Sequence, residues 1–547
     1  MKNRYLIKIV LSAVLLAFLL VPIHTFSQTN SGDLEKIVDS LFIGYSNQNE
    51  PGVIIGIMKN DSIILKKAYG SSNIELNVPI SNETKFHIAS LTKQFTAFAI
   101  AQLEGQGKLS YQDDIRNYLP ELNDFGRVIT IDHLLHHTSG LRSSNRLRLL
   151  QDDFYETILT QENALQLIFA QKELNFDPGS EFGYSNSGYI LLATIVERIS
   201  NMKFSEWLEQ NVFQPLDMNQ SIVVSGQAQQ DPNKAIPYEK NGDGYKQTMG
   251  MDWLDYGATG IYSTIEDLVK WQRYLHSLNY MWLGESSSSF PYGMGLYVVK
   301  SSEGDIEQIY HTGDGVGYIS FMSYYPMEQL DVILLSNLNS NEPIRLAEEI
   351  VGILNSKNKN LTTEIEPQLE VPLEILEIYA GTYDAEQFKP EFEIKDSQLY
   401  ALSSQGADLL VALNETTFVI PNTPVQFEFD KAGQYVILKM PDNELKFPRI
   451  TPEEVSHTID LSDYTGIYYS PELDVSYSLK VDNNQLVAES PKNRRIVFGS
   501  IAMDTTESED RYFRNIHFSR DENNRINGLR VTDIDGRVRN LWFEKKE

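Results

Sequence analysis

A change of pattern at residues 355–372 constrains the fold of this chain more than any other feature. Before it, apolar runs of strand length are mixed with longer apolar runs of helix length. The stretch itself is polar and begins Asn-Ser-Lys-Asn-Lys-Asn, which is typical of a linker. After it the helical period disappears, and short alternating segments are separated by Asp, Asn and Gly. We therefore expect a mixed α+β domain at 30–355, a linker at 356–372, and a tail built from strands.

The first domain contains clear strand and helix signals. Val53–Met58 and Ser62–Ala68 flank Asn60-Asp61, which predicts a hairpin. Leu91–Leu103 is apolar, has no interior Gly or Pro, and is followed by glycines, which predicts a buried helix. Val332–Leu335 is a further apolar strand.

The tail repeats a short motif. The sequence Tyr379-Ala-Gly-Thr-Tyr matches Tyr464-Thr-Gly-Ile-Tyr, and alternating apolar residues follow each copy. We interpret the repeat as two small antiparallel β-barrel-like modules, at 373–452 and 458–547, each of a size that suits a barrel or sandwich. Tyr and Phe at a period of two indicate barrel core positions rather than a ligand platform.

The first residues are typical of an export signal. Lys2, Arg4 and Lys8 precede an apolar run from Ile9 to Val21, and small residues follow. Such a run is shorter than the roughly 20 residues that span a membrane. We expect a cleaved signal peptide at 1–27, a secreted or periplasmic protein, and no stable membrane anchor. An uncleaved anchor is the alternative.

Charge and cysteine content exclude several classes of function. The net charge is −29 and the pI about 4.7, whereas phosphate binding requires clustered Lys and Arg, so we expect no nucleic-acid partner. The chain has no cysteine, which removes disulfides, thiol nucleophiles and thiolate zinc sites. His133 and His137 have a metal-like spacing, but the Glu of H-E-x-x-H is missing between them, so we expect no metal.

Ser90-Leu-Thr-Lys93 opens the long apolar segment. Residues three apart share a helix face, so the amine of Lys93 can reach the hydroxyl of Ser90. The N-terminus of a helix also favours an anion that develops at Ser90. A serine beside such an amine is an activated nucleophile. The same spacing recurs from Ser200 and from Ser356, but neither of these serines opens an apolar helix.

Two further short sequences carry groups for this chemistry. In Tyr184-Ser-Asn186, a phenol that shares protons with an amine can act as general base and then as general acid, and the amide can bind a substrate carbonyl. His311-Thr312-Gly313 ends a strand, and its glycine lets an extended substrate approach closely and pair as an extra strand.

In this order and at this separation, the three motifs resemble those of the serine β-lactamase and penicillin-binding-protein-like family, especially its class C β-lactamase, D,D-carboxypeptidase, D-aminopeptidase and esterase group. The resemblance covers residues 35–350 and implies an antiparallel sheet flanked by helices, with a helical subdomain. The flanking segments that are also similar are Phe86-His-Ile-Ala, Leu134-Leu-His-His-Thr-Ser-Gly-Leu, Gly257-Ala-Thr-Gly-Ile and Tyr292-Gly-Met-Gly.

The resemblance implies a role for each site residue and no cofactor. Ser90 is expected to be acylated, and Lys93 and Tyr184 are expected to move its proton, with either of them as the acylation base. The backbone N–H groups of Ser90 and Asp314 are expected to bind the oxyanion. The residues expected to contact the substrate are Asn186, His311, Thr312, Gly313 and Asp314.

Two departures from the family pattern bear on the substrate. His311 stands where β-lactamases of this class carry Lys, which favours peptidase-like or esterase-like activity over β-lactam hydrolysis. Peptidases of this kind hold a substrate carboxylate with an Arg shortly after the Tyr-Gly-x-Gly stretch. That Arg is absent here, and Lys300 is the replacement we consider.

We therefore expect a serine hydrolase that acts through an acyl-serine on small D-amino-acid peptides, amides or esters, including peptidoglycan fragments. A β-lactamase proper and a catalytically silent binding protein are the alternatives. The two β-modules are expected either to shape access to the site, as one does in D-aminopeptidases of this family, or to serve as a spacer or a wall- or partner-binding module.

Overall fold

The structure is a computed structural model that describes most of residues 31–546. The predicted signal peptide and residues 359–370 of the predicted linker lie outside the described residues. So do 28–30, 152–159, 225–230, 243, 249–253, 279–291, 302, 316, 384–389, 396, 404–405, 421–425, 441–442, 450–459, 493, 502–503 and 547.

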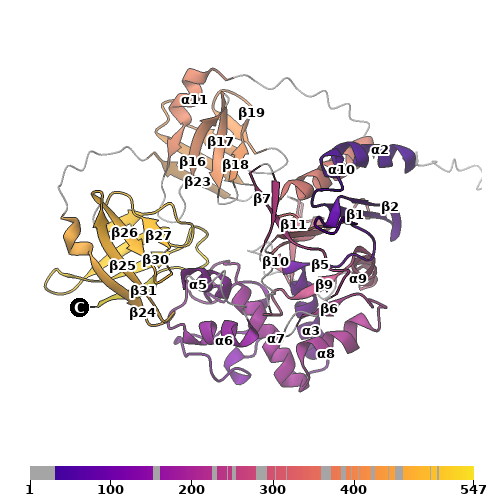
Figure 1. The fold of residues 1–547 in the computed structure, drawn as a ribbon, viewed down its shortest axis with the longest axis horizontal. Coiled ribbons are helices and arrows are strands. Elements are labelled where there is room, and N and C mark those ends of the chain that lie inside the picture. Colours follow the sequence, from indigo (N-terminus) through magenta and orange to yellow (C-terminus); the bar gives the residue numbers. More distant parts are fainter. Residues whose placement is uncertain are drawn as a thin grey trace, which may run out of the picture.

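An antiparallel sheet of seven strands forms the centre of the N-terminal domain, which we take as residues 31–358 (Figure 1). Asn60 and Asp61 both take a positive φ between its last two strands, so the predicted hairpin is confirmed. In order across the sheet the strands are β10 (Tyr292–Gly293), β11 (Leu296–Lys300), β12 (Ile306–Gly315), β13 (Tyr318–Tyr325), β14 (Leu330–Ser336), β1 (Val53–Lys59) and β2 (Ser62–Tyr69).

Helices cover both faces of this sheet because its inner strands are apolar on both sides. The covering helices are α2 (Ser31–Leu41) and α10 (Glu342–Asn358) on one face, and α3 (Thr92–Gly105) and α9 (Ile265–Ser277) on the other. Along β1, Val53 and Ile55 pack on the first face and Ile54 and Met58 on the second, which is the period of two of a strand. The buried helix predicted over Leu91–Leu103 is confirmed as α3.

A helical subdomain continues the core on the α3 side. Its helices are α4 (Ile131–Leu135), α5 (Ser144–Leu150), α6 (Gln161–Ala170), α7 (Asn186–Ser200) and α8 (Phe204–Leu208), with the short turns η3 (Ala89–Leu91), η4 (Ile115–Asn117) and η5 (Glu209–Phe213). Near the N-terminus, η2 spans Ile43–Tyr45. The small sheets pair β3 (Ser71–Asn73) with β4 (Val78–Pro79), β7 (Tyr238–Asn241) with β8 (Gly244–Gln247), and β9 (Ile261–Ser263) with both β5 (Phe86–His87) and β6 (Ile222–Val223).

Module 1 follows as two antiparallel sheets around one core, and an isolated bridge between Tyr383 and Arg449 joins their outer strands. Its elements are α11 (Leu373–Tyr379), β15 (Gly381–Thr382), β16 (Glu391–Lys395), β17 (Gln398–Ser403), β18 (Gly406–Leu409), β19 (Val411–Ala412), β20 (Thr417–Val419), β21 (Gln426–Phe429), β22 (Tyr435–Met440) and β23 (Asn443–Pro448).

Module 2 is one antiparallel sheet of eight strands whose outer strands meet at an isolated bridge between Phe498 and Ser508, which closes it into a barrel-like shape. After η7 (Leu461–Tyr464), the strands in sheet order are β27 (Arg495–Val497), β26 (Gln485–Glu489), β25 (Val475–Asp482), β24 (Gly466–Ser470), β31 (Leu541–Lys546), β30 (Ile526–Thr532), β29 (Asn515–Arg520) and β28 (Thr505–Glu507).

The repeated motif has the same local geometry in both modules. A short helical turn leads to Gly381 in one and Gly466 in the other, with φ of +139° and +137°. The hydroxyl of the tyrosine that follows then donates to a carbonyl four residues earlier, at 3.0 Å and 2.9 Å. The predicted fold class, an α+β domain followed by two strand-rich modules, is confirmed.

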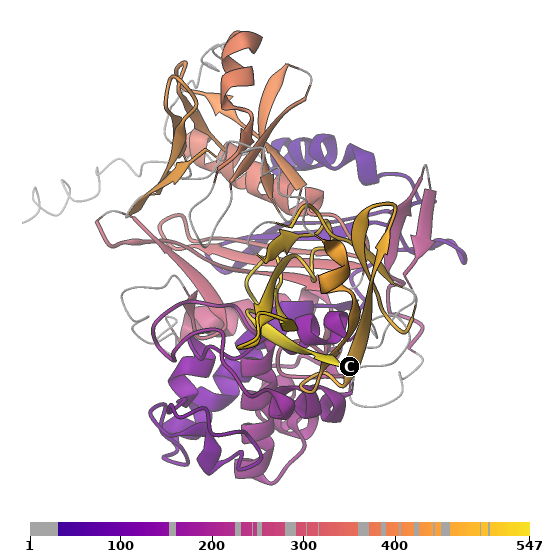
Figure 2. The same ribbon diagram turned by 90° about the vertical axis from the view of Figure 1, so that its left-hand side faces the viewer.

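Module 2 packs directly on the helical subdomain (Figure 2). Leu147 and Leu150 of α5 and Leu167 of α6 belong to the same apolar core as the strands of module 2. The hydroxyl of Tyr477 donates to the carbonyl of Leu150 at 2.9 Å. The N-terminal domain therefore completes the core of module 2. Within the described part of the chain, no helix is long and apolar enough to cross a membrane.

Candidate active site

Ser90 lies in the η3 turn immediately before α3 and remains partly exposed. The residue before it, Ala89, takes a φ of +45°, a conformation that is uncommon without glycine and that clusters at functional turns. The carbonyl of Ile88 accepts a hydrogen bond of 2.8 Å from Ser320 on β13. The turn is therefore held against the central sheet, with Ser90 at the helix N-terminus as the sequence predicts.

Lys93 is fully buried one helical turn after Ser90 and has three hydrogen-bond partners. Its Nζ lies 3.0 Å from Ser90 Oγ, 2.9 Å from Asn186 Oδ1 and 3.0 Å from the carbonyl oxygen of Ala258. A Cβ at Gly295, where φ is +83°, would lie 2.8 Å from the backbone of Lys93, so only glycine fits this turn. The segments that contain Ala258 and Gly295, both noted in the sequence as similar to the family, therefore enclose Lys93.

The surroundings of Lys93 favour its neutral form. Burial lowers the pKa of Lys93 well below 10.5, and the cation of Arg537 acts in the same direction, whereas Asp255 opposes it. Asp255 itself is almost completely buried, and burial raises its pKa to about 7. An amine whose neutral form is favoured in this way can accept the proton of a serine hydroxyl.

Tyr184 reaches the same place from the loop before α7. Its ring centroid lies 4.8 Å from Lys93 Nζ and 4.3 Å from the ring centroid of His137. Burial raises the pKa of Tyr184 to about 12, while its hydrogen bond with Ser90 and the cation of Arg537 act in the opposite direction. The phenol therefore stays protonated at neutral pH. Ser90, Lys93, Tyr184 and Asn186, which the sequence predicts as one site, are all brought together.

Strand β12 passes beside Ser90 and carries the remaining predicted residues. A Cβ at Gly313 would lie 2.4 Å from the carbonyl oxygen of Ile88, so the glycine permits the close approach of β12 to the turn that carries Ser90. Thr312 is partly buried and Asp314 is exposed at the edge of the site. The surrounding protein raises the pKa of Asp314, while Arg146 and Arg537 act in the opposite direction.

His311 is a neutral side chain in this site. It is almost completely buried, its Nε2 lies 2.9 Å from the hydroxyl of Tyr292, and its Nδ1 lies 2.6 Å from the carbonyl oxygen of Thr312. Burial lowers the pKa of His311 to about 3, and repulsion from Lys93 acts in the same direction. Strand β12 therefore brings no positive side chain to the site at the position where the related β-lactamases carry Lys.

The histidines near residue 135 have structural partners. His133 Nδ1 accepts from the backbone N–H of Thr130, His136 Nδ1 lies 3.0 Å from the carbonyl oxygen of Asp132, and His137 Nδ1 accepts from the N–H of Ser185. Within the described residues there is no group of three or more side chains that could hold a metal ion.

Three contributors to the site were not identified from the sequence. The carbonyl of Ala258 orients Lys93, the buried carboxyl of Asp255 acts on its charge, and Arg537 of module 2 lies over the ring of Tyr184. The similar segment around Ala258 was the only sequence signal for any of them. Lys300, considered as a substrate-binding cation, lies at the exposed end of β11, so nothing places it with Ser90.

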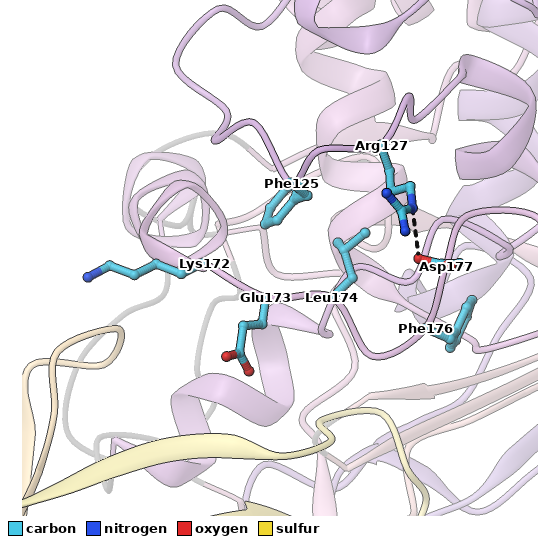
Figure 3. A pocket seen from close by; sticks show the side chains of 7 residues that line it. All are labelled: Phe125, Arg127, Lys172, Glu173, Leu174, Phe176 and Asp177. Carbon is cyan, nitrogen blue, oxygen red and sulfur yellow. Dashed lines mark hydrogen bonds and ion pairs between the residues drawn. The ribbon is translucent and has the colours of Figure 1, made fainter.

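A pocket of about 330 Å³ lies beside the segment 172–177 (Figure 3). An ion pair of 3.1 Å between Arg127 and Asp177 forms part of its wall. Glu173 points toward module 2, where it pairs with Arg530. None of the predicted site residues lines this pocket. The lining residues are Phe125, Arg127, Lys172, Glu173, Leu174, Phe176 and Asp177.

Comparison with known sequences identifies one family. The family model described as Beta-lactamase matches residues 36–353. The protein flp of Staphylococcus aureus strain MW2 is 26% identical over 352 residues, which cover 61% of this chain and 69% of that protein. A D-aminopeptidase of Gluconobacter oxydans strain 621H is 24% identical over 341 residues, which cover 60% of this chain and 63% of that protein.

Solved structures show the same fold. An octameric penicillin-binding protein homologue from Pyrococcus abyssi has a TM-score of 0.53 at 21% identity, and the match covers 85% of this chain and 99% of that chain. A D-amino acid amidase from Ochrobactrum anthropi SV3 has a TM-score of 0.50 at 19% identity and covers 60% of this chain and all of its own. The first match extends beyond the N-terminal domain.

Proposed function

The chain belongs to the beta-lactamase family, and on that premise we propose that it is a serine hydrolase that cleaves small D-amino-acid peptides, amides or esters through an acyl intermediate on Ser90. The observation that carries the proposal is the buried Lys93 amine, 3.0 Å from Ser90 Oγ and bound to two further acceptors. The likeness to a D-aminopeptidase supports the substrate class.

Lys93 is the acylation base in this proposal. A neutral amine has two N–H bonds and one lone pair. Ala258 offers a carbonyl oxygen and Asn186 its Oδ1, and both can only accept, so they take the two N–H bonds. The lone pair is then directed at Ser90. As Ser90 Oγ attacks the substrate carbonyl carbon, its proton passes to Lys93.

Tyr184 is the proton donor to the leaving group. When the tetrahedral intermediate collapses, the bond between the carbonyl carbon and the leaving nitrogen or oxygen breaks, and the phenol supplies the proton that this atom requires. The proton held by Lys93 then restores the phenol. Water attacks the acyl-serine, releases the acid and regenerates the Ser90 hydroxyl. The N–H groups of Ser90 and Asp314 bind the oxyanion in both steps.

The neutral state of His311 supports a peptidase-like or esterase-like activity rather than that of a β-lactamase proper. In the related β-lactamases a Lys occupies this position, and its charge attracts an anionic substrate. Here both ring nitrogens of His311 have partners on the protein, and its pKa of about 3 keeps the ring uncharged.

We also propose that the chain is exported. The basic start and the apolar run up to Val21 support a signal peptide that is removed near residue 27, which fits a periplasmic or secreted enzyme with access to peptidoglycan fragments. Mass spectrometry of the mature N-terminus tests this, because an intact Met1 in exported protein contradicts cleavage.

Labelling of the nucleophile tests the enzymatic proposal. The purified protein is incubated with a fluorescent penicillin and, separately, with a fluorophosphonate, and the labelled residue is mapped by mass spectrometry. We expect label on Ser90, none in Ser90→Ala, and unchanged labelling in Ser200→Ala, which alters one of the two other serines followed by lysine three residues later. Full labelling of folded Ser90→Ala would contradict the proposal.

A further inference from the structure

A positive charge beside the site comes from module 2. Lys93 is buried and His311 is neutral, so neither offers a cation to a substrate. The guanidinium of Arg537, in the loop between β30 and β31 of module 2, lies 5.1 Å from the ring centroid of Tyr184. Arg537 is partly exposed.

The backbone of Arg537 is tied to the catalytic residues through a short chain of hydrogen bonds. Its carbonyl oxygen accepts from the N–H of Ser143 at 3.1 Å and from the side-chain amide of Asn175 at 3.0 Å. Ser143 Oγ in turn accepts from the N–H of Asn186 at 3.0 Å, and the side chain of Asn186 binds Lys93. The position of Arg537 is therefore set with respect to the Lys93 amine.

The loop is anchored on both sides of Arg537. Before it, Asp535 forms an ion pair with Arg146 of α5. After it, the N–H of Arg539 donates to Asn175 Oδ1 at 2.7 Å, and its guanidinium lies 2.8 Å from Glu181. Such fixed flanks reduce the conformational entropy that a side chain loses on binding a ligand.

Arg537 differs from the neighbouring arginines in its partners. Arg146, Arg530 and Arg539 each pair with a carboxylate across the interface. Among the described residues, no carboxylate lies within ion-pair distance of the Arg537 guanidinium. The guanidinium nevertheless lies over the ring of Tyr184, and its charge also acts on Lys93. A guanidinium held in this way is suited to bind a carboxylate in two-point fashion.

We propose that Arg537 is a specificity-determining residue that binds a free carboxylate on the leaving-group side of the scissile bond. The side follows from Tyr184, because the phenol beneath the guanidinium is the donor to the leaving group. This inference rests on the proposed function. No arginine follows the Tyr-Gly-x-Gly stretch in the N-terminal domain of this chain. On this inference, Arg537 of module 2 binds the substrate carboxylate instead.

The test compares two substrates that differ only in that carboxylate. The first is an N-acetyl-D-alanyl ester of D-lactate, and the second is the same ester with the lactate carboxylate converted to a carboxamide. The readout is the ratio of their kcat/KM values. We expect wild-type protein to favour the carboxylate, and Arg537→Gln to lower the ratio roughly 10- to 100-fold, the value of a charge-assisted hydrogen bond. Arg537→Lys should fall between the two.

A matched control removes the same charge from the same module. Arg525 is highly exposed and precedes β30, whereas Arg537 follows it, so the two lie at opposite ends of that strand. Arg525→Gln should leave the ratio unchanged. An unchanged ratio in Arg537→Gln, or an equal loss in both glutamine variants, would overturn the inference.

A second measurement does not depend on turnover and separates this inference from the proposed function. The rate at which a fluorophosphonate labels Ser90 is measured with free D-lactate or with lactamide present. D-lactate should protect Ser90 in the wild type and not in Arg537→Gln. Equal protection by D-lactate and lactamide refutes the role of Arg537. If Ser90 is labelled in neither the wild type nor Arg537→Gln, the proposed function itself is refuted.

Discussion

The buried ion pair between Arg142 and Glu472 should control the docking of module 2. Arg142 belongs to the N-terminal domain and is completely buried, whereas Glu472 lies in the turn between β24 and β25 and is 4% exposed. They lie 2.8 Å apart, and the Arg142 guanidinium also donates to the carbonyl of Arg539 at 3.0 Å. Burial lowers the pKa of Arg142, and Glu472 opposes this shift. The pair therefore stabilises a charge that has no access to water.

Glu472→Gln removes the buried carboxylate and leaves the buried cation with only the half-exposed Glu173, which lies 3.5 Å from it. Breaking a buried pair from one side costs about 3–5 kcal/mol. Arg142 and Glu472 belong to the N-terminal domain and to module 2. The lost free energy should therefore weaken the docking of module 2, and the docking equilibrium constant should change by roughly two to almost four powers of ten. Arg142→Met combined with Glu472→Gln leaves no buried charge, so the double variant should recover at least half of the loss.

Hydrogen exchange of the Ser143 amide measures this equilibrium, because that N–H is bonded to the carbonyl of Arg537 across the interface. Its protection should fall in Glu472→Gln and partly return in the double variant. The exposed pair between Arg495 and Asp482 provides a control, and Asp482→Asn should change stability by less than about 1 kcal/mol. A change below about 1 kcal/mol in Glu472→Gln, or no recovery in the double variant, would refute the reasoning.

Three further predictions concern the site itself. The kcat/KM profile should fall on the acid side with an ionisation well below 10.5, since Lys93 must be neutral, and this limb should move to higher pH in Arg537→Gln because a repelling cation is gone. His311 has a folded pKa of about 3, so its contribution to stability is complete above pH 6.5 and falls by about 2 kcal/mol between pH 7 and pH 5. Urea unfolding of the wild type and of His311→Asn at both pH values measures this contribution as the difference between their slopes. Gly295→Ala should lower both activity and the melting temperature, whereas Gly304→Ala, which also has a positive φ but an open environment, should cost only about 1 kcal/mol.

The sequence was informative where chemistry depends on neighbours along a helix. Ser90 and Lys93 are three residues apart, and this spacing alone places their side chains together. The motif that contains Tyr184 and Asn186 could be predicted because it follows the motif of Ser90 and Lys93 in the order that is typical of the family. The alternation of apolar residues likewise predicts the hairpin of β1 and β2 and the strand-rich tail.

The remaining parts of the site depend on contacts that leave no local signal. The carbonyl of Ala258 is a backbone group, and any residue type would supply it. Arg537 follows an Asp-Gly pair that predicts a turn, but nothing in that turn shows which surface it will meet. The charge state of His311 is set by burial and by partners such as Tyr292. These features are tertiary, so only the arrangement of the folded chain discloses them.

The shared core of α5 and module 2 has a consequence for biosynthesis. Leu147 and Leu150 are made early, but the strands that cover them come last, and β31 ends at Lys546. During synthesis these leucines stay uncovered until the strands of module 2 have been made. A product that stops near residue 360 would contain Ser90 and Lys93, yet it would present an apolar surface that favours aggregation. The order of the chain thus delays assembly of a complete site until its final strand is delivered.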